Sequence, residues 1–230
     1  MKALFALSFM GFCLCCYSVA MANEQRHHYH HGDKKQGYHN HASEELRGLM
    51  ADLRRGGHVL LIRHERTNMF LLDKPNRDLS DCNTQRNLSP AGIGMAKENG
   101  DNLKYLEIPI GKVISSPMCR TLETARYMFR RYEVDSVFLG NPMEKEKHGQ
   151  DILDFAKGLI EPNINHVMVG HLSNIQMAFG IMVHEGDTVV IGEEDGELRV
   201  VDVIQANGWN DLVHDEVNRK KLKAQRAKAQ

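Results

Sequence analysis

From Ser43 onward, hydrophobic positions alternate between two patterns. Longer segments with apolar residues at helical spacing predict amphipathic helices, and the short apolar runs between them predict buried strands. The expected helices cover residues 43–55, 89–106, 121–131, 150–160 and 173–183, and a polar helix starts at about residue 209. The expected strands cover residues 58–62, 112–115, 134–139 and 166–169. This alternation predicts an α/β fold, a three-layer sandwich with helices on both faces of a mostly parallel sheet.

The pattern changes near the end of the chain. Two apolar runs, residues 187–191 and 198–204, flank Glu193-Glu194-Asp195-Gly196. An Asp-Gly pair between two such runs favours a tight β-turn. We therefore expect an antiparallel hairpin at one edge of the sheet.

The first 22 residues have the composition of a targeting segment. Met1 and Lys2 precede an almost wholly apolar run, which ends in the small-x-small sequence Ala20-Met21-Ala22. This order is typical of a signal peptide and its cleavage site. A membrane anchor is the alternative, but the run is near the lower limit for a span and no basic cluster follows it. We expect a periplasmic or secreted protein with no stable membrane insertion after cleavage.

Residues 23–42 are polar and rich in histidine. A segment with so little to bury cannot offset its own ordering entropy, so we expect a disordered arm ahead of a folded domain over residues 43–230. Histidine side chains bind Ni²⁺ and Zn²⁺. The possible adventitious ligands are His27, His28, His30 and His31, and the arm also contains His39 and His41.

Charge and cysteine content limit the function classes further. The formal net charge of −1 gives no reason to expect nucleic acid as a partner. Three of the five cysteines lie in the expected signal peptide, which leaves Cys82 and Cys119. In an oxidising compartment an isolated pair invites a disulfide, and two separately buried thiols are the alternative.

Arginine and histidine residues follow three of the predicted strands. Arg63 and His64 follow the first strand, residues 115–120 with Arg120 at their end follow the second, and His171 follows the fourth. Open α/β sheets bind their ligands at the carboxyl ends of the strands. Guanidinium groups bind phosphate, and their positive field favours neutral imidazoles nearby, which are nucleophilic. These residues alone predict an anion-binding crevice.

Four segments carry a resemblance to a known family. Residues 61–67 (LIRHERT) resemble the Arg-His-Gly signature of the histidine phosphatase superfamily, which includes cofactor-dependent phosphoglycerate mutases and many small phosphatases. Residues 87–92 (NLSPAG) resemble its Leu-Ser/Thr-x-x-Gly helix start. Residues 115–125 (SSPMCRTLETA) are similar to its Ser-Ser-Pro-x-x-Arg-Thr-x-x-Thr-Ala segment, and residues 169–171 resemble its second-histidine site. The four matches follow the family order over about residues 58–180.

The resemblance implies an exported, histidine-dependent phosphatase, a phosphoric monoester hydrolase. His64 would be the nucleophile that becomes phosphohistidine, and Arg63, Arg120 and His171 would bind the transferring oxygens. Attack by water would then release phosphate and restore the imidazole. No cofactor and no metal in the active site are implied. We expect a small phosphorylated substrate, with an envelope sugar phosphate as the specific guess.

The resemblance also suggests a proton donor and a place for the disulfide. Family members that have a proton donor place an acid after the third strand, where this chain offers Glu144 and Glu146. A solvated run of charges is the alternative for both. Cys119 is adjacent to Arg120, and Cys82 lies in the loop that leads to the helix at Ser89, so a disulfide would join that loop to the pocket.

One residue departs from the family signature. Glu65 replaces the glycine of the signature, and we expect its carboxylate to lie beside the anion pocket and repel substrate unless Arg66 or another cation neutralises it. Arg86 could reach the crevice, although a salt bridge is its expected role. The basic tail, residues 219–228, is expected to be a solvated helix end.

Three other functions are compatible with parts of the sequence. Export disfavours a mutase, because it separates the protein from glycolytic substrates, and the same objection applies to a protein phosphohistidine phosphatase. The alternative from another class is a non-catalytic metal-binding or phosphate-sensing envelope protein that uses the histidine arm.

Overall fold

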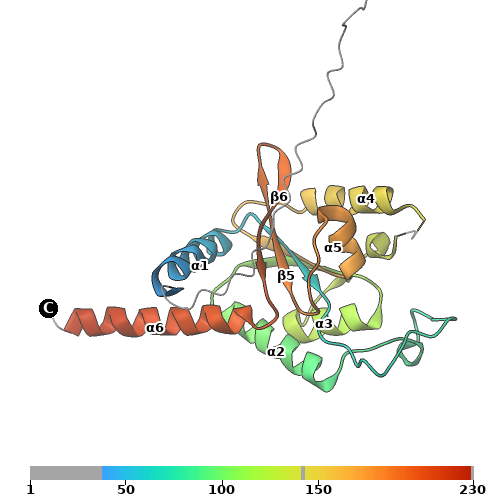
Figure 1. The fold of residues 1–230 in the computed structure, drawn as a ribbon, viewed down its shortest axis with the longest axis horizontal. Coiled ribbons are helices and arrows are strands. Elements are labelled where there is room, and N and C mark those ends of the chain that lie inside the picture. Colours follow the sequence, from blue (N-terminus) through green and yellow to red (C-terminus); the bar gives the residue numbers. More distant parts are fainter. Residues whose placement is uncertain (1–37, 141–142, 229–230) are drawn as a thin grey trace, which may run out of the picture. The chain divides into compact units, whose positions relative to one another are not determined.

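A six-stranded sheet forms the centre of the domain, with the strand order β3-β2-β4-β1-β5-β6 (Figure 1). The strands are β1 (Val59–Arg63), β2 (Ile110–Ser115), β3 (Glu133–Val134), β4 (Asn165–Gly170), β5 (Thr188–Glu194) and β6 (Glu197–Ile204). The pairs β1–β4, β2–β4 and β2–β3 are parallel, whereas β1–β5 and β5–β6 are antiparallel. The mostly parallel sheet and its antiparallel edge hairpin are confirmed.

The computed structural model describes residues 38–140 and 143–228, which belong to one compact unit. The expected signal peptide and residues 23–37 of the expected arm lie outside the described residues. The helices are α1 (Tyr38–Arg55), α2 (Pro90–Tyr105), α3 (Cys119–Phe129), α4 (Lys145–Lys157), α5 (Leu172–Phe179) and α6 (Gly208–Lys228), with short 3-10 helices η1 (Cys82–Thr84) and η2 (Ser136–Leu139). Within the described residues, no helix has the length and apolar character needed to cross a membrane.

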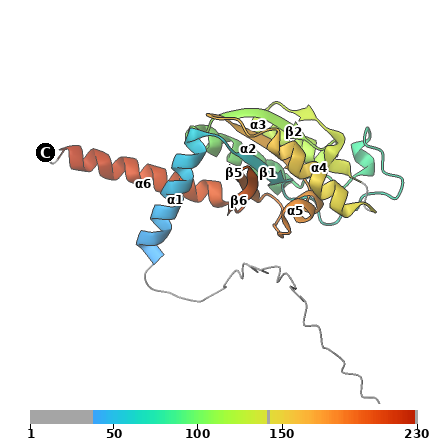
Figure 2. The same cartoon turned by 90° about the horizontal axis from the view of Figure 1, so that it is seen from above.

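Helices cover both faces of the sheet, as Figures 1 and 2 show. Because successive strand residues point to opposite faces, Leu60 and Ile62 of β1 pack in one core cluster, with residues of α1, α2, α3 and α6. Val59 and Leu61 pack in the other cluster, with residues of η2, α4 and α5. The predicted three-layer sandwich is therefore confirmed.

The start of α2 shows how one sequence motif fixes the fold near the end of β1. The Ser89 hydroxyl accepts a hydrogen bond from the Gly92 N–H, and Pro90 is the first helical residue. Ser89 N–H donates to the Arg66 carbonyl over 2.9 Å. A Cβ atom on Gly92 would lie 2.1 Å from that same carbonyl oxygen, so only glycine fits there.

The prediction of a third strand over residues 134–139 is wrong. Only two residues form β3, and the chain then turns into η2. The Asp135 side chain accepts a hydrogen bond from the Val137 N–H and so caps the 3-10 turn. Phe138 is buried, whereas Val134 and Leu139 are exposed, so the run does not bury a strand face.

Most predicted helices and strands are present in the structure, but several begin or end at other residues than predicted. Helix α1 begins at Tyr38, ahead of the expected Ser43, and α4 begins at Lys145 rather than residue 150. Helix α5 ends early, because Gly180 adopts the left-handed conformation at its C-terminus, with φ of 69°. The expected hairpin turn is present, with Asp195 and Gly196 both at positive φ.

Candidate active site

The sheet brings the predicted arginine and histidine motifs to one edge. Arg63 at the end of β1 lies opposite Gly170 at the end of β4, and the His64 N–H donates to the Gly170 carbonyl. The next residue after Gly170 is His171, whose ring lies 5.6 Å from the His64 ring, centroid to centroid. Ser116, which follows β2, lies 2.9 Å from His171 through its hydroxyl. Three segments far apart in sequence therefore meet at one place, the candidate site for the crevice that the sequence predicts.

His64 is buried in a form suited to nucleophilic attack. Its Nδ1 lies 2.9 Å from the Glu65 carbonyl oxygen, which can only accept, so Nδ1 carries the proton and Nε2 keeps its lone pair. Burial lowers the pKa of His64 to about 4, and the positive charges of Arg120 and Arg63 add to this effect. The ring is therefore neutral near pH 7.

The Asn174 side chain fixes the backbone of His171 at the start of α5. Its backbone N–H donates to the Asn174 side chain over 2.7 Å, and Asn174 in turn donates to the Phe138 carbonyl. Burial lowers the pKa of His171 well below its ordinary value, and Arg120 lowers it further. Its Nε2 lies 2.9 Å from the Ser116 hydroxyl, and the ring is neutral near pH 7.

Three buried nitrogen atoms of the crevice side chains have no hydrogen-bond partner among the described residues. They are Nε of Arg63, Nε of Arg120 and Nδ1 of His171. Buried N–H groups are ordinarily satisfied, and leaving one unpaired costs about 1–3 kcal/mol. An anion with several acceptor oxygens is the ligand class that meets this requirement.

Asp73 is a neighbour of Arg120 that the sequence did not reveal. Both of its carboxylate oxygens lie 3.4 Å from Arg120 Nη1, and one of them also accepts the Arg86 backbone N–H over 2.9 Å. Arg77 lies 3.5 Å from the other oxygen. No periodicity or motif marks Asp73, because it lies in the long loop between β1 and α2.

Glu185 is a second carboxylate that was missed. It lies 3.8 Å from Arg63, 3.6 Å from Arg86 and 4.0 Å from His64 Nδ1. Burial acts to raise the pKa of Glu185, but two hydrogen bonds from Thr67 and nearby positive charge lower it overall, so the group is ionised near pH 7. Arg86 therefore makes the expected salt bridge, and that salt bridge borders the crevice.

The position of Glu185 has a signal in the sequence that could have found it. Strand β5 runs antiparallel to β1, with Thr188 opposite Ile62. Residues just before β5 therefore lie where β1 ends, beside His64. A search of that position for charged residues identifies Glu185.

The two acids expected after the third strand lie at the start of α4. Glu144 directly precedes the helix, Glu146 is in its first turn, and both are exposed. Glu185, rather than Glu144, is the carboxylate 4.0 Å from His64 Nδ1.

The expectation for Glu65 is wrong. Its side chain is fully buried, so its carboxylate is not open to a substrate, and it accepts a hydrogen bond from Asn99 of α2 over 3.0 Å. Burial raises the pKa of Glu65 to about 7. A Cβ atom on Gly186 would lie 2.7 Å from the Glu65 carboxylate, so Gly186 makes room for it. Asn99 and partial protonation, more than Arg66, accommodate this group.

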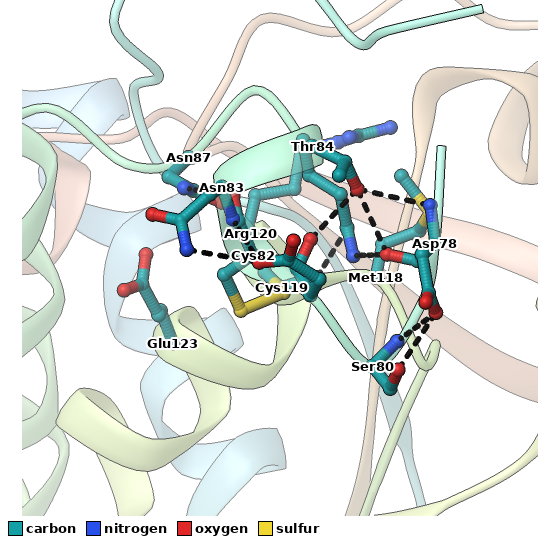
Figure 3. The surroundings of a disulfide bond; sticks show 12 residues. Asp78, Ser80, Cys82, Asn83, Thr84, Asn87, Met118, Cys119, Arg120 and Glu123 are labelled. Atoms are coloured by element: carbon teal, nitrogen blue, oxygen red, sulfur yellow. Dashed lines mark hydrogen bonds between the residues drawn. A yellow bond between two sulfur atoms is a disulfide. The ribbon is translucent and has the colours of Figure 1, made fainter. Parts of the chain in front are cut away.

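The predicted disulfide between Cys82 and Cys119 is present, with 5.7 Å between the Cα atoms. It joins the loop after β1 to the first residue of α3, directly before Arg120 (Figure 3). Cys119 N–H also donates to the Gln85 side chain over 2.9 Å. The loop is thus attached by a covalent bond and a hydrogen bond to Cys119, the residue before the pocket arginine Arg120.

Within residues 38–140 and 143–228, no group of three or more His, Cys, Asp or Glu side chains is arranged to hold a metal ion. The histidines proposed as metal ligands, His27, His28, His30 and His31, lie outside the described residues.

Protein-family models give no match to this chain, and curated protein sequences give none either. Solved structures do match. The protein of open reading frame Rv3214 from Mycobacterium tuberculosis is 16% identical, with a TM-score of 0.50 over 65% of this chain and 97% of that chain. A phosphoserine phosphatase mutant from Entamoeba histolytica, in complex with phosphoserine, is 17% identical with a TM-score of 0.49 over 66% of this chain and 98% of that chain. The protein histidine phosphatase SixA complexed with tungstate is 14% identical, with a TM-score of 0.47 over 65% of this chain and 97% of that chain. At this low identity the likeness to the Rv3214 protein shows a shared fold.

Proposed function

We propose that this protein is a phosphatase that hydrolyses a phosphomonoester through a phosphohistidine intermediate on His64. The observation that carries the proposal is a buried, neutral imidazole whose Nδ1 is bound to a carbonyl oxygen, which leaves Nε2 as the nucleophile. The unpaired N–H groups of Arg63 and Arg120, with the unpaired Nδ1 of His171 beside them, support an oxyanion as the ligand.

The reaction has two displacement steps. His64 Nε2 attacks phosphorus, the bond from phosphorus to the ester oxygen breaks, and the alcohol leaves with a proton. Water then attacks the phosphohistidine in line, releases inorganic phosphate and restores the neutral ring. Arg63 and Arg120 stabilise the charge on the phosphoryl oxygens in both transition states, and the unpaired Nδ1 of His171 is available to bind one of them.

The proton for the leaving alcohol needs a source. We keep Glu144, the acid expected after the third strand, as the proposed donor; it directly precedes α4. A general acid matters most for poor leaving groups. Glu144→Gln should therefore slow hydrolysis of an alkyl phosphate more than that of an aryl phosphate, and equal slowing of both would remove Glu144 from the mechanism.

The compartment and the substrate are also part of this proposal. The apolar leader with its Ala20-Met21-Ala22 end supports export, and an envelope sugar phosphate is a substrate class that an exported phosphatase would meet. The disulfide between Cys82 and Cys119 is in keeping with an oxidising compartment.

The test is hydrolysis of a soluble aryl phosphate by the wild-type chain and by His64→Ala. Loss of the nucleophile should lower kcat by about 10⁴-fold or more, with folding retained by circular dichroism. His214→Ala, which changes an exposed histidine on α6, is the matched control and should keep full activity. Near-normal kcat in His64→Ala would overturn the assignment, and strong inhibition of the wild type by a chelator would move the chemistry to a metal.

A further inference from the structure

Glu185 is a half-buried carboxylate beside His64 that neither displacement step uses. Its side chain is 22% exposed, and its Oε1 lies 4.0 Å from His64 Nδ1, the ring nitrogen that does not attack phosphorus. A charged group that is withdrawn from solvent loses hydration, so it stays charged only where its surroundings compensate. The contacts of Glu185 therefore indicate why a negative charge lies there.

The backbone that carries Glu185 is fixed against the backbone of the nucleophile. The Gly186 N–H donates to the His64 carbonyl over 3.0 Å, and the Arg63 N–H donates to the Asp187 carbonyl over 3.0 Å. Gly186 adopts a φ of 89°, which favours glycine, so the turn just before β5 depends on the residue next to Glu185. The pairing that places His64 at the end of β1 therefore also places Glu185.

The side chain of Glu185 is held by hydrogen bonds and by positive charge. The Thr67 N–H and the Thr67 hydroxyl donate to its two carboxylate oxygens over 3.0 and 2.8 Å. Arg63 and Arg86 lie 3.8 and 3.6 Å from Oε1. Burial acts to raise the pKa of Glu185, but the Thr67 hydrogen bonds and nearby positive charge lower it overall. A fixed negative charge therefore faces the Nδ1 edge of the His64 ring near pH 7.

The His64 ring acquires a positive charge in the proposed reaction. It starts neutral, with its proton on Nδ1. The Nε2 lone pair forms the bond to phosphorus, and the electron pair of the phosphorus–ester bond leaves with the alcohol oxygen, which takes a proton from the general acid. The ring keeps its Nδ1 proton and becomes a cation. When water attacks phosphorus, the electron pair of the nitrogen–phosphorus bond returns to Nε2, one water proton goes to solvent, and the ring is neutral again.

The charges around His64 act on this cation in opposite directions. Burial lowers the pKa of His64 most, and Arg120 and Arg63 lower it further, whereas Glu185 acts to raise it. A group that attracts the cationic ring more than the neutral ring favours the transition state over the ground state. The Glu185 carboxylate meets this condition, because a full negative charge 4.0 Å from Nδ1 attracts a cation far more than a neutral ring.

We propose that Glu185 is a positioning residue for phosphoryl transfer, whose carboxylate stabilises the cationic His64 ring of the phosphohistidine intermediate from the Nδ1 side. The same carboxylate neutralises part of the charge of Arg63 and Arg86, so it does not strengthen binding of the phosphate anion. Glu185 therefore acts on the rate of phosphoryl transfer and not on the affinity for phosphate. This inference rests on the proposed function, because it needs a phosphoryl group on His64.

Two substitutions separate the charge of Glu185 from its shape. Glu185→Gln keeps the length of the side chain, and its amide can accept the Thr67 N–H and donate to the Thr67 hydroxyl. Glu185→Asp keeps the charge but shortens the side chain by one methylene, which weakens both hydrogen bonds. Glu161→Gln is the matched control, because Glu161 also lies beside a histidine, 3.0 Å from Nε2 of His166 near the start of β4, at the other end of the sheet.

The experiment measures the rate of phosphorylation and the affinity for phosphate separately. Release of the aryl alcohol from a soluble aryl phosphate in a single turnover, with enzyme in excess, gives the rate constant of the first displacement. Competitive inhibition by inorganic phosphate gives the affinity. Glu185→Gln should lower the rate constant at least about tenfold, with the inhibition constant for phosphate unchanged or lower. Glu185→Asp should lose less, and Glu161→Gln should match the wild type in both quantities.

Three results would contradict a role for the charge. They are an unchanged rate constant in Glu185→Gln, a larger loss in Glu185→Asp than in Glu185→Gln, and a rise in the inhibition constant as large as the fall in the rate constant. The last two are the results expected of a purely structural brace. If Glu185→Gln does not fold by circular dichroism, Glu185→Asp decides: a rate constant within about tenfold of the wild type supports the charge, and a larger loss contradicts it.

Mapping of the phosphorylated peptide keeps the two proposals distinguishable. If no phosphohistidine forms on His64 in the wild-type chain, the proposed function fails. If it forms at the same rate in the wild type and in Glu185→Gln, the proposed function stands and only the role of Glu185 is overturned.

Discussion

The strand ends and the β1–α2 loop contribute charged groups to the same crevice by different physical means. Arg63, His64 and His171 are positioned by the register of neighbouring parallel strands, which is set by buried apolar residues on both faces of the sheet. Asp73 and Arg77 are positioned by a loop whose shape depends on hydrogen bonds, ion pairs and one disulfide. The sheet fixes the reacting groups, and the loop adds groups that set how Arg120 and the crevice entrance are presented.

Removing the disulfide should have the largest effect on stability, and it acts on the loop rather than on the strand ends. Cys82→Ser with Cys119→Ser should lower the free energy of unfolding by about 4 kcal/mol on the chain-entropy estimate for a loop of this length. Because the loop also braces Arg120, which contacts the phosphoryl oxygens in the bound state and in the transition states, KM for an aryl phosphate should rise more than kcat falls. Urea unfolding and steady-state kinetics measure both.

Reduced wild-type protein is the control for this variant and should behave as the double serine variant does. An unchanged free energy of unfolding in both would contradict the role given to the loop. A loss of kcat as large as the rise in KM would show that the loop takes part in the chemical step.

The contribution of Glu65 to the pH dependence of the free energy of unfolding tests the strand-end region. Its folded pKa of about 7 exceeds the ordinary value of 4.5, so the folded state binds the proton more tightly than the unfolded state. This contribution to stability is fully present below pH 4.5 and is lost as pH rises through 7, by about 3 kcal/mol.

Glu65→Gln, which stays neutral, should remove that loss. The measurement is the free energy of unfolding at pH 5 and pH 8, with the exposed Glu98→Gln as matched control. If the free energy of unfolding of the wild type changes as little between pH 5 and pH 8 as that of Glu65→Gln, then Glu65 is ionised in the folded protein without loss of stability.

Asp73 gives the smallest expected effect. Its carboxylate contacts Arg120 in the free protein and so competes with substrate phosphate for the same guanidinium. Asp73→Asn removes the charge and keeps an acceptor for the Arg86 N–H, so KM should fall about threefold with kcat unchanged. Asp78→Asn, whose side chain bonds Ser80 within the loop, is the control. A higher KM in Asp73→Asn would show that Asp73 positions Arg120 rather than competing for it.

The sheet and the four motifs could be predicted because local patterns determine them. Apolar runs bounded by helix caps mark β1 and β4, and Ser89-Pro90 with Gly92 marks the start of α2. Histidine and arginine at the carboxyl ends of strands then converge, since parallel strands end at the same edge of the sheet.

The failures have other causes, because a local cap decided the first and contacts between distant residues decided the others. Residues 134–139 have a strand-like pattern, but the cap at Asp135 produces a 3-10 turn instead. Glu65 was expected to lie beside the crevice. Asn99 and Gly186, which make a buried site for its carboxylate, are distant in the sequence, so the local motif could not reveal them. Asp73 lies in an irregular loop, where spacing carries no information about contacts.

The measurement that tests the central claim most directly is chemical identification of the phosphorylated residue. The chain is mixed with a soluble aryl phosphate, quenched in alkali during turnover and mapped by mass spectrometry. The account predicts one acid-labile phosphoryl group on the peptide that contains His64, absent from His64→Ala. A phosphoryl group on His171 or on any other residue during productive turnover, with His64 unmodified, would contradict the account.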